Sequence, residues 1–306
     1  MGTAAERVAV HARRQHGLFT VRQALDAGYS SNLLSRRLRA HDWEEVEHRV
    51  LRVLPAGPLT WHQRLCARTL ATGGAASCRG AAMLHGLLHA RRGEEVPTDV
   101  IVHRSARTAS HMQVHSTLDL PDTDLMVVDG IRVTTPIRTL LDLGAVIGRD
   151  RFEDVLDLAL MRRLVTPERL AQRAVELWAP RRSGCALVLG LLEARSPGSM
   201  KVASLWEARM LREILKVGLP EPSCNHPVIV GGRRRYIDFA WPGAKVAVEF
   251  DGFEFHSSRR TFDDDRARQN DLVDADWRVF RLTATVLASS SRRALAPVAR
   301  ALGFNW

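Results

Sequence analysis

The spacing of apolar residues in the first 55 positions predicts three short helices followed by two strands. Helical periodicity covers residues 4–16, 20–27 and 30–40. Thr20 is suited to cap the second helix, and Ser30 or Ser31 to cap the third. Gly28 can supply a left-handed turn between them. Residues 43–54 alternate enough to form a two-stranded wing. This order of elements predicts a winged helix-turn-helix.

The third predicted helix has an apolar face and a polar face. Leu34 and Leu38 face inward by helical spacing. The outward positions carry side chains that reach base edges and phosphates when such a helix enters a major groove: Asn32, Arg36, Arg37 and Arg39. The alternative is a helical cap that only packs on the next domain. Acidic residues of the wing favour that alternative, because they repel phosphate: Glu44, Glu45 and Glu47.

Residues 56–195 show both periodicities and predict a mixed α/β region. Helices are expected over residues 59–74, 77–89, 150–162 and 166–178, and strands over residues 96–104, 112–116 and 131–133. Thr135 caps a further helix whose first residue is Pro136. A Pro-Gly-Ser segment at 197–199 ends the region. The predicted domains are therefore residues 1–55, 56–195 and 196–306.

Histidines of the middle region raise the question of a metal site: His85, His89, His103, His111 and His115. The first two are four residues apart on a predicted helix, a spacing that can chelate zinc. No glutamate lies between them in the catalytic pattern, and no third ligand is evident. The sequence therefore favours structural histidines over a metal site.

The last third of the chain contains two strands that carry acidic residues. In residues 235–241, Asp238 alternates with Ile237 and Phe239 and therefore points to the opposite face. In residues 245–251, Glu249 and Asp251 share one face, roughly 7 Å apart.

The loop between these strands decides whether the three acidic residues meet. A two-residue turn at Pro242-Gly243, or a four-residue loop, places Asp238 on the face of Glu249 and Asp251. A three-residue loop without a bulge separates them. If they meet, their mutual repulsion calls for a hard cation, Mg²⁺ or Mn²⁺, which takes oxygen ligands. The alternative is a solvated sheet face.

A helix expected from about Met200 adds a fourth acidic residue. Its predicted buried stripe consists of Ala203, Met210, Leu211, Ile214 and Leu215. Glu207 falls on this stripe, where a carboxylate is costly unless it is paired or bound to a cation. Alternatively, Glu207 lies at the edge of the stripe with its carboxylate in water.

Composition and charge restrict the class of protein. The 306 residues carry a formal net charge of +10, which favours a polyanionic partner such as nucleic acid. No uncharged apolar stretch is long enough for a membrane span, and the charged N-terminus is unlike a signal peptide. The four cysteines lie far apart, as suits a reducing cytoplasm. These features predict a cytoplasmic protein.

The N-terminal half resembles AbiEi-type antitoxins, whose winged-helix domain is common in actinobacterial proteins. The resemblance rests on the stretch GLFTVRQALDAGYSSNLLSRRLRAHDWEEVEHRVLRV, and on SCRGAAMLHGL and GIRVTTPIRTLLDL in the middle region. It covers about residues 10–190 and implies a DNA-binding N-terminal domain. Family members usually carry a glycine in the wing, whereas the corresponding stretch here is EHRVLR.

The last third resembles the PD-(D/E)XK nuclease superfamily, in the branch similar to very-short-patch-repair endonucleases. The resemblance covers about residues 200–290 and rests on the spacing D-x₁₀-E-x-D-G, the helix TFDDDRARQNDLVDADW and the strand WRVFRLT. It implies metal-site carboxylates at Glu207, Asp238 and Glu249, with Asp251 in the usual lysine position. His256 matches a histidine of this branch and is a candidate general base. Arg266 or Arg268 would then replace the charge of the lysine.

The sequence therefore predicts a multi-domain α/β chain with three parts: a winged helix-turn-helix, a mixed α/β middle and a restriction-endonuclease-like domain. The first functional hypothesis is a Mg²⁺- or Mn²⁺-dependent DNA endonuclease, in repair or defence, acting on double-stranded DNA. The second is a catalytically inactive DNA-binding regulator or antitoxin-like protein, which Asp251 in place of the lysine favours. An RNA nuclease is a third alternative. The sequence names no recognition site, protein partner or oligomeric state.

Overall fold

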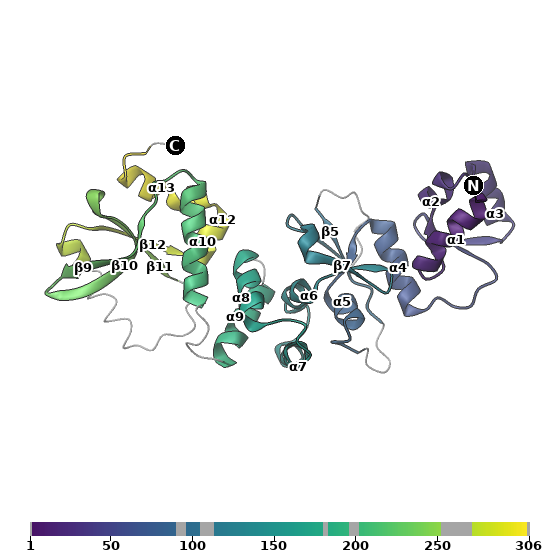
Figure 1. Cartoon of the computed structure of the whole chain (residues 1–306), viewed down its shortest axis with the longest axis horizontal. Coiled ribbons are helices and arrows are strands. Elements are labelled where there is room, and N and C mark those ends of the chain that lie inside the picture. The colour runs from purple at the N-terminus through teal and green to yellow at the C-terminus, as the bar shows by residue number, and fades with distance from the viewer. Residues whose placement is uncertain are drawn as a thin grey trace. The chain divides into compact units, whose positions relative to one another are not determined.

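The computed structural model of the chain describes residues 2–89, 96–104, 113–179, 183–195, 202–251 and 271–304. The chain divides into two compact units, Met1–Thr166 and Pro167–Trp306 (Figure 1). Each unit contains helices and a mixed or antiparallel sheet, so the predicted α/β class is confirmed. The division assigns two helices of the predicted middle region to the second unit. The three predicted domain ranges stay a prediction.

The first part of the N-terminal unit has the element order of a winged helix-turn-helix. Its elements are α1 (Ala4–Arg14), β1 (Leu18–Thr20), α2 (Val21–Asp26), α3 (Ser31–Arg39), β2 (Trp43–Glu47) and β3 (Val50–Val53). The strands form an antiparallel sheet in the order β1-β3-β2. Phe19, Leu34 and Trp43 belong to its core, with the rings of Phe19 and Trp43 packed edge to face.

Local capping explains where these helices begin. Thr20 accepts a hydrogen bond from the backbone N–H of Gln23, whose side chain accepts one from Thr20 in return. The Ser30 hydroxyl accepts a hydrogen bond from the Leu33 N–H at the start of α3. Gly28 has a φ of 102°, the left-handed conformation that glycine adopts without steric cost. The predicted caps and turn are confirmed.

The wing forms without the glycine that the antitoxin-like sequences carry. Arg49, between β2 and β3, adopts a left-handed φ of 58°. Its backbone N–H donates to the carboxylate of Glu45 at 2.6 Å. A side-chain acceptor therefore supports the conformation that a glycine would adopt more readily.

The second part of the N-terminal unit contains a five-stranded mixed sheet. Its elements are α4 (Trp61–Thr72), β4 (Ala75–Ala76), α5 (Cys78–Leu84), β5 (Val100–His103), β6 (Val114–Thr117), a 3₁₀ turn η1 (Asp122–Asp124), β7 (Leu125–Val128), β8 (Ile131–Thr134), α6 (Pro136–Leu143) and α7 (Arg149–Met161). The strand order is β6-β5-β4-β8-β7. Thr135 caps α6 and Pro136 is its first residue, as predicted.

The winged part packs directly on this second part. Leu18 and Val50 belong to the same buried cluster as Leu65 and Val133. The amide of Gln63 also donates to the backbone carbonyl of His16 at 3.0 Å. The winged helix is therefore continuous with the neighbouring sheet through a shared apolar core.

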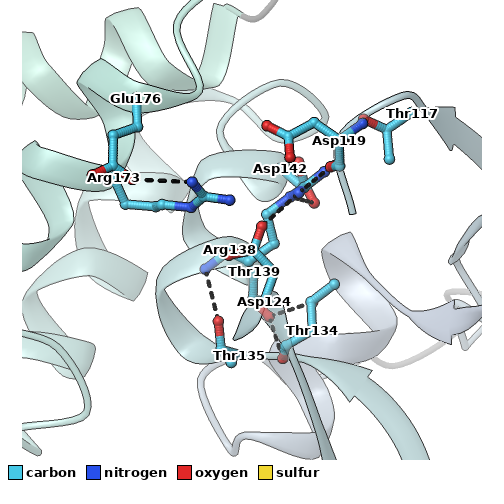
Figure 2. A network of polar contacts seen from close by, with 10 residues as sticks. All are labelled: Thr117, Asp119, Asp124, Thr134, Thr135, Arg138, Thr139, Asp142, Arg173 and Glu176. Carbon is cyan, nitrogen blue, oxygen red and sulfur yellow. Dashed lines mark hydrogen bonds and ion pairs between the residues drawn. The ribbon is translucent and has the colours of Figure 1, made fainter. Parts of the chain in front are cut away.

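A buried arginine crosslinks the loop before β7 with helix α6 (Figure 2). The Arg138 side chain is 1% exposed and donates to Asp124 and Asp142, each at 2.8 Å. It also donates to the backbone carbonyl of Asp119 at 2.7 Å. Burial lowers the pKa of Arg138, but the two carboxylates outweigh burial and raise it. The arginine is therefore charged and bonded to two carboxylates and a backbone carbonyl.

The second unit is built around a four-stranded mixed sheet. Its elements are α8 (Pro167–Glu176), α9 (Ser183–Arg195), α10 (Val202–Lys216), β9 (Ser223–Val230), β10 (Arg233–Trp241), a 3₁₀ turn η2 (Pro242–Ala244), β11 (Val246–Asp251), β12 (Arg278–Thr283), α12 (Ala284–Ser289) and α13 (Ser291–Ala301). The strand order is β12-β11-β10-β9. β11 and β12 are parallel, and the other pairs are antiparallel.

The two faces of this sheet have separate apolar cores. Helices α10, α12 and α13 cover one face, where Met210 packs with Phe239 and Val248 (Figure 1). The opposite face packs Ala240 and Ala247 against Leu272 and Trp277.

Among the described side chains of α10, the buried stripe differs from the prediction at Leu215 and Trp206. Leu215 is exposed, although helical spacing placed it on the inner face. Trp206 is buried instead, together with Met210 and Ile214, which lie four and eight residues later. The inner face of the helix is therefore rotated toward Trp206.

Candidate carboxylate site

The loop between β10 and β11 spans four residues. Trp241 pairs with Val246, and Phe239 with Val248, so residues 242–245 form the connection. This is one of the two loop lengths predicted to place Asp238 on the face of Glu249. The four-residue alternative is therefore the one that the structure adopts.

Asp238 lies where strand β10 becomes irregular. The pairing between β9 and β10 omits Asp238 and Asn225, and Asn225 has a left-handed φ of 49°. Ile237 packs on the Ala247 face although Phe239, two residues later, packs on the α10 face. The prediction that Ile237 and Phe239 share a face is therefore wrong, because regular alternation stops at Asp238.

The carboxylate of Asp238 bridges to the neighbouring strand. Its Oδ2 accepts a hydrogen bond from the backbone N–H of Phe250 at 2.9 Å. The regular backbone pairs of β10 and β11 end at Phe239 and Val248. Beyond them, the Asp238 side chain, rather than a backbone carbonyl, accepts the hydrogen bond from β11. This bond fixes the carboxylate beside β11, one residue beyond Glu249.

Glu249 is the most buried of the described candidate carboxylates, at 7% exposure. It alternates with Val248 and Phe250, which pack on the α10 side. The parallel register places Arg281 of β12 beside Glu249. Residues paired in this way share a face, so a cation lies next to the buried glutamate. Sequence reasoning missed Arg281, although it belongs to the strand WRVFRLT that carries the family resemblance.

Glu207 lies on α10 with its side chain at the surface. The preceding residue, Trp206, is buried and stacks on Phe250 with ring centroids 5.8 Å apart. Partial burial, together with the negative charge of Asp238, raises the pKa of Glu207. Of the two predicted placements, the edge of the stripe is therefore the correct one, and Glu207 is electrostatically coupled to Asp238.

The described part of the chain holds no group of three or more acidic, cysteine or histidine side chains that could bind a metal ion. Glu207, Asp238 and Glu249 therefore do not form a complete metal site by themselves.

The remaining predicted site residues lie outside the part of the chain that the structure describes. They are the side chain of Asp251, His256, Arg266 and Arg268. The common face for Asp238, Glu249 and Asp251 therefore stays a prediction, as do the roles of the histidine and the two arginines.

The predicted DNA-facing side of α3 is open to solvent. Its four candidate contacts are exposed: Asn32, Arg36, Arg37 and Arg39. Leu34 is buried and Leu38 packs against the core. Arg37 pairs with Asp42 at 2.8 Å, and this carboxylate raises the pKa of Arg37, so the arginine stays charged. The face is therefore positively charged and unobstructed within the described part of its unit.

Three described histidines of the middle region, His85, His103 and His115, have side-chain contacts within the fold. His85 lies just beyond the end of α5, and its Nε2 is 2.8 Å from the carbonyl oxygen of Thr134. His103 contacts the carbonyl of Leu118 at 3.1 Å, and His115 contacts Asp99 at 3.2 Å. Helix α5 ends before His89, so the helical spacing that suits zinc is not formed. His111 lies outside the described residues.

Comparison with known proteins gives distant relatives. The chain is 25% identical over 179 residues to the uncharacterized proteins MT2308 and Rv2248 of Mycobacterium tuberculosis, strains CDC 1551 / Oshkosh and ATCC 25618 / H37Rv. The match covers 58% of this chain and 64% of each relative, so it spans less than two thirds of their length. No protein-family profile matches the chain.

Among the described helices, none combines the length and apolar character needed to cross a bilayer.

Proposed function

We propose that the chain is a DNA-binding, divalent-metal-dependent endonuclease whose centre is built around Asp238. The observation that carries the proposal is the position of this carboxylate. It is fixed to β11 through the Phe250 N–H, and it raises the pKa of Glu207 on α10. Two carboxylates from different elements are thus held close enough to repel each other, with the buried Glu249 on the adjoining strand.

The donor set suits a hard cation. Carboxylate oxygens are the ligands that Mg²⁺ and Mn²⁺ prefer, and a cation offsets the repulsion between Glu207 and Asp238. Glu207, Asp238, Glu249 and Asp251 are the proposed ligands. A bound cation would polarise the phosphodiester and lower the pKa of an attacking water.

Arg281 offers the positive charge that Asp251 does not. In the nucleases that the sequence resembles, a lysine stands at the position of Asp251, and an aspartate cannot replace its charge. Arg281 neighbours Glu249 in the parallel register, and it can therefore stabilise negative charge on a phosphate held there. His256 remains the proposed general base, with Arg266 as a further cation.

A catalytically inactive DNA-binding regulator is the second candidate. It is favoured by Asp251, which stands in the usual position of the lysine. In this alternative, α3 binds DNA and the second unit serves as a binding module.

A cleavage panel separates the two candidates. The full chain is incubated with duplex, mismatched, branched and single-stranded DNA, and with RNA, in Mg²⁺, in Mn²⁺ and in excess chelator. The endonuclease proposal expects cleavage that requires the metal and disappears with chelator. Binding without cleavage on every substrate would support the regulator instead.

The arginines of α3 provide a test of DNA binding by the first unit. Replacing Arg36 and Arg37 with alanine is expected to weaken binding to duplex DNA, because both side chains are exposed and charged. The slope of log affinity against log salt should fall by about 1 for each lost phosphate contact. Fluorescence anisotropy over a series of salt concentrations measures both quantities.

Arg149 provides a control for this experiment, in which a single arginine is removed. It is an exposed arginine of α7 in the same unit and pairs with Glu153 at 2.8 Å. Arg149→Ala should leave the affinity and the salt slope nearly unchanged. If the variant of Arg36 and Arg37 binds as tightly as the wild type with the same slope, α3 does not contact DNA.

A further inference from the structure

The outer half of the β9–β10 hairpin is a two-stranded ribbon. Among the described residues, only the last three of β10, Phe239–Trp241, pair with β11, whereas β10 pairs with β9 from Arg233 onwards. The ribbon is closed by Gly231 and Gly232, whose φ values of 55° and 70° are both left-handed. Two such residues form the tight turn that matches the twist of paired strands.

One face of the ribbon is anchored to its own unit. Val230 and Ile237 pack with Leu272 and Trp277. Arg235 pairs with Asp271 at 3.3 Å, and Asp271 lies close to Gly231 of the turn. The ribbon is therefore held in place from one side.

The other face is exposed and combines apolar, aromatic and basic groups. Ile229 is 78% exposed and pairs in the register with Arg234. The guanidinium of Arg234 lies 5.6 Å from the ring centroid of Tyr236, which is 45% exposed. Arg233 pairs with Val230 and therefore lies at the end of the anchored face, next to the turn, where it is a second exposed arginine.

We propose that this ribbon, next to the Asp238 site, enters a groove of duplex DNA and binds the phosphate backbone through Arg233 and Arg234. The proposal rests on the proposed nuclease function and assigns a substrate contact to the second unit. A major groove admits a two-stranded ribbon, and guanidinium groups pair with phosphate oxygens in bidentate geometry. Both arginines are exposed, so their charge is available to a phosphate.

The ribbon is continuous with the proposed catalytic centre. Arg234 and Asp238 are four residues apart on the same strand, roughly 13 Å along a strand. The anchored face fixes the ribbon relative to the sheet that carries Asp238. DNA held by the arginines would therefore pass close to the carboxylates. Ile229 and Tyr236 supply apolar contact to the sugars and base edges that line a groove.

The test is the double variant Arg233→Ala with Arg234→Ala in the full chain. Binding to a duplex of about 25 base pairs should weaken by roughly 10- to 100-fold at about 0.1 M salt, and the salt slope should fall by about 2. Fluorescence anisotropy measures both. The far-ultraviolet circular dichroism and the melting temperature should match the wild type, because both side chains are exposed.

A matched control variant shows whether a loss of DNA affinity depends on the position of the two arginines or only on the net charge of the unit. Arg293 and Arg300 are exposed arginines on α13 of the same unit, and their double alanine variant removes the same charge. It should keep most of the affinity. An equal loss in this control, or a wild-type chain that does not bind duplex DNA at low salt, overturns the proposal.

Binding and cleavage together distinguish this proposal from the nuclease function. If no substrate is cleaved but the hairpin variant loses affinity, the ribbon is a DNA contact and the nuclease proposal fails. If the wild type cleaves and the hairpin variant binds and cleaves equally well, the nuclease proposal stands and the ribbon proposal fails. If the hairpin variant keeps the wild-type affinity for DNA, the exposed face of the ribbon would instead be a candidate surface for a protein partner.

Discussion

Replacing Arg138 with methionine is expected to lower the free energy of unfolding of the first unit by about 3–5 kcal/mol. Methionine keeps an unbranched side chain but is shorter and uncharged, so Asp124 and Asp142 lose the guanidinium that both contact at 2.8 Å. The side chain of Asp124 is buried, and a carboxylate without its cation is costly there. Urea denaturation of the full chain measures the loss, and amide hydrogen exchange in α6 locates it.

Arg132 provides the control for the buried arginine. It belongs to the same unit and pairs with Asp122 at 3.3 Å, but the Asp122 side chain is 98% exposed. Solvent screens such a pair, so Arg132→Met should change the stability by less than about 1 kcal/mol. Removing the charges of Asp124 and Asp142 by asparagine substitution should recover part of the stability lost in the Arg138 variant. If the Arg138 and Arg132 variants unfold at the same urea concentration, the buried network does not stabilise the unit.

Local sequence signals predicted the N-terminal helices well. The cap at Thr20, the cap at Ser30 and the left-handed Gly28 all depend on residues within a few positions of one another. Such contacts can be predicted from sequence because they require no knowledge of the rest of the fold. The short strand β4 was missed, since its two residues are defined by pairing with Ile101 and Val133, which are distant in sequence.

The carboxylate site marks the limit of what periodicity can predict. Regular alternation holds along β11, where Val248 and Ala247 lie on opposite faces. The same alternation wrongly placed Ile237 on the face of Phe239. At Asp238 the side chain, rather than the backbone, bonds to β11, and the residues of β10 before and after it do not alternate regularly. The position of Arg281 beside Glu249 depends on the register of two strands joined by a long connection, which a sequence does not specify.

Asp238→Asn is expected to abolish metal-dependent cleavage while leaving the fold intact. Asparagine retains an oxygen that can accept the hydrogen bond from the Phe250 N–H, so the link to β11 should persist. The substitution removes one negative charge from the proposed cation site, and the affinity of a hard cation depends on ligand charge. Mn²⁺ binding, followed by electron paramagnetic resonance, should therefore weaken together with cleavage.

The same variant has an electrostatic readout that does not depend on activity. The negative charge of Asp238 contributes to the raised pKa of Glu207. Removing that charge makes ionisation of Glu207 easier, so its pKa should fall toward the ordinary value. A carbon-detected nuclear magnetic resonance titration of the glutamate carboxyl groups measures this shift. A Glu207 pKa that does not change in the variant would show that the two carboxylates are not coupled.

Asp276 supplies the control. It is a highly exposed aspartate of the same unit, 3.6 Å from Lys245, and Asp276→Asn removes the same charge away from the proposed centre. That variant should bind Mn²⁺, cleave DNA and titrate Glu207 as the wild type does. If wild type and Asp238→Asn cleave equally well, the activity does not depend on Asp238, and the endonuclease centre proposed around it is wrong. If cleavage is lost but DNA affinity stays at the wild-type level, Asp238 acts in catalysis rather than in binding.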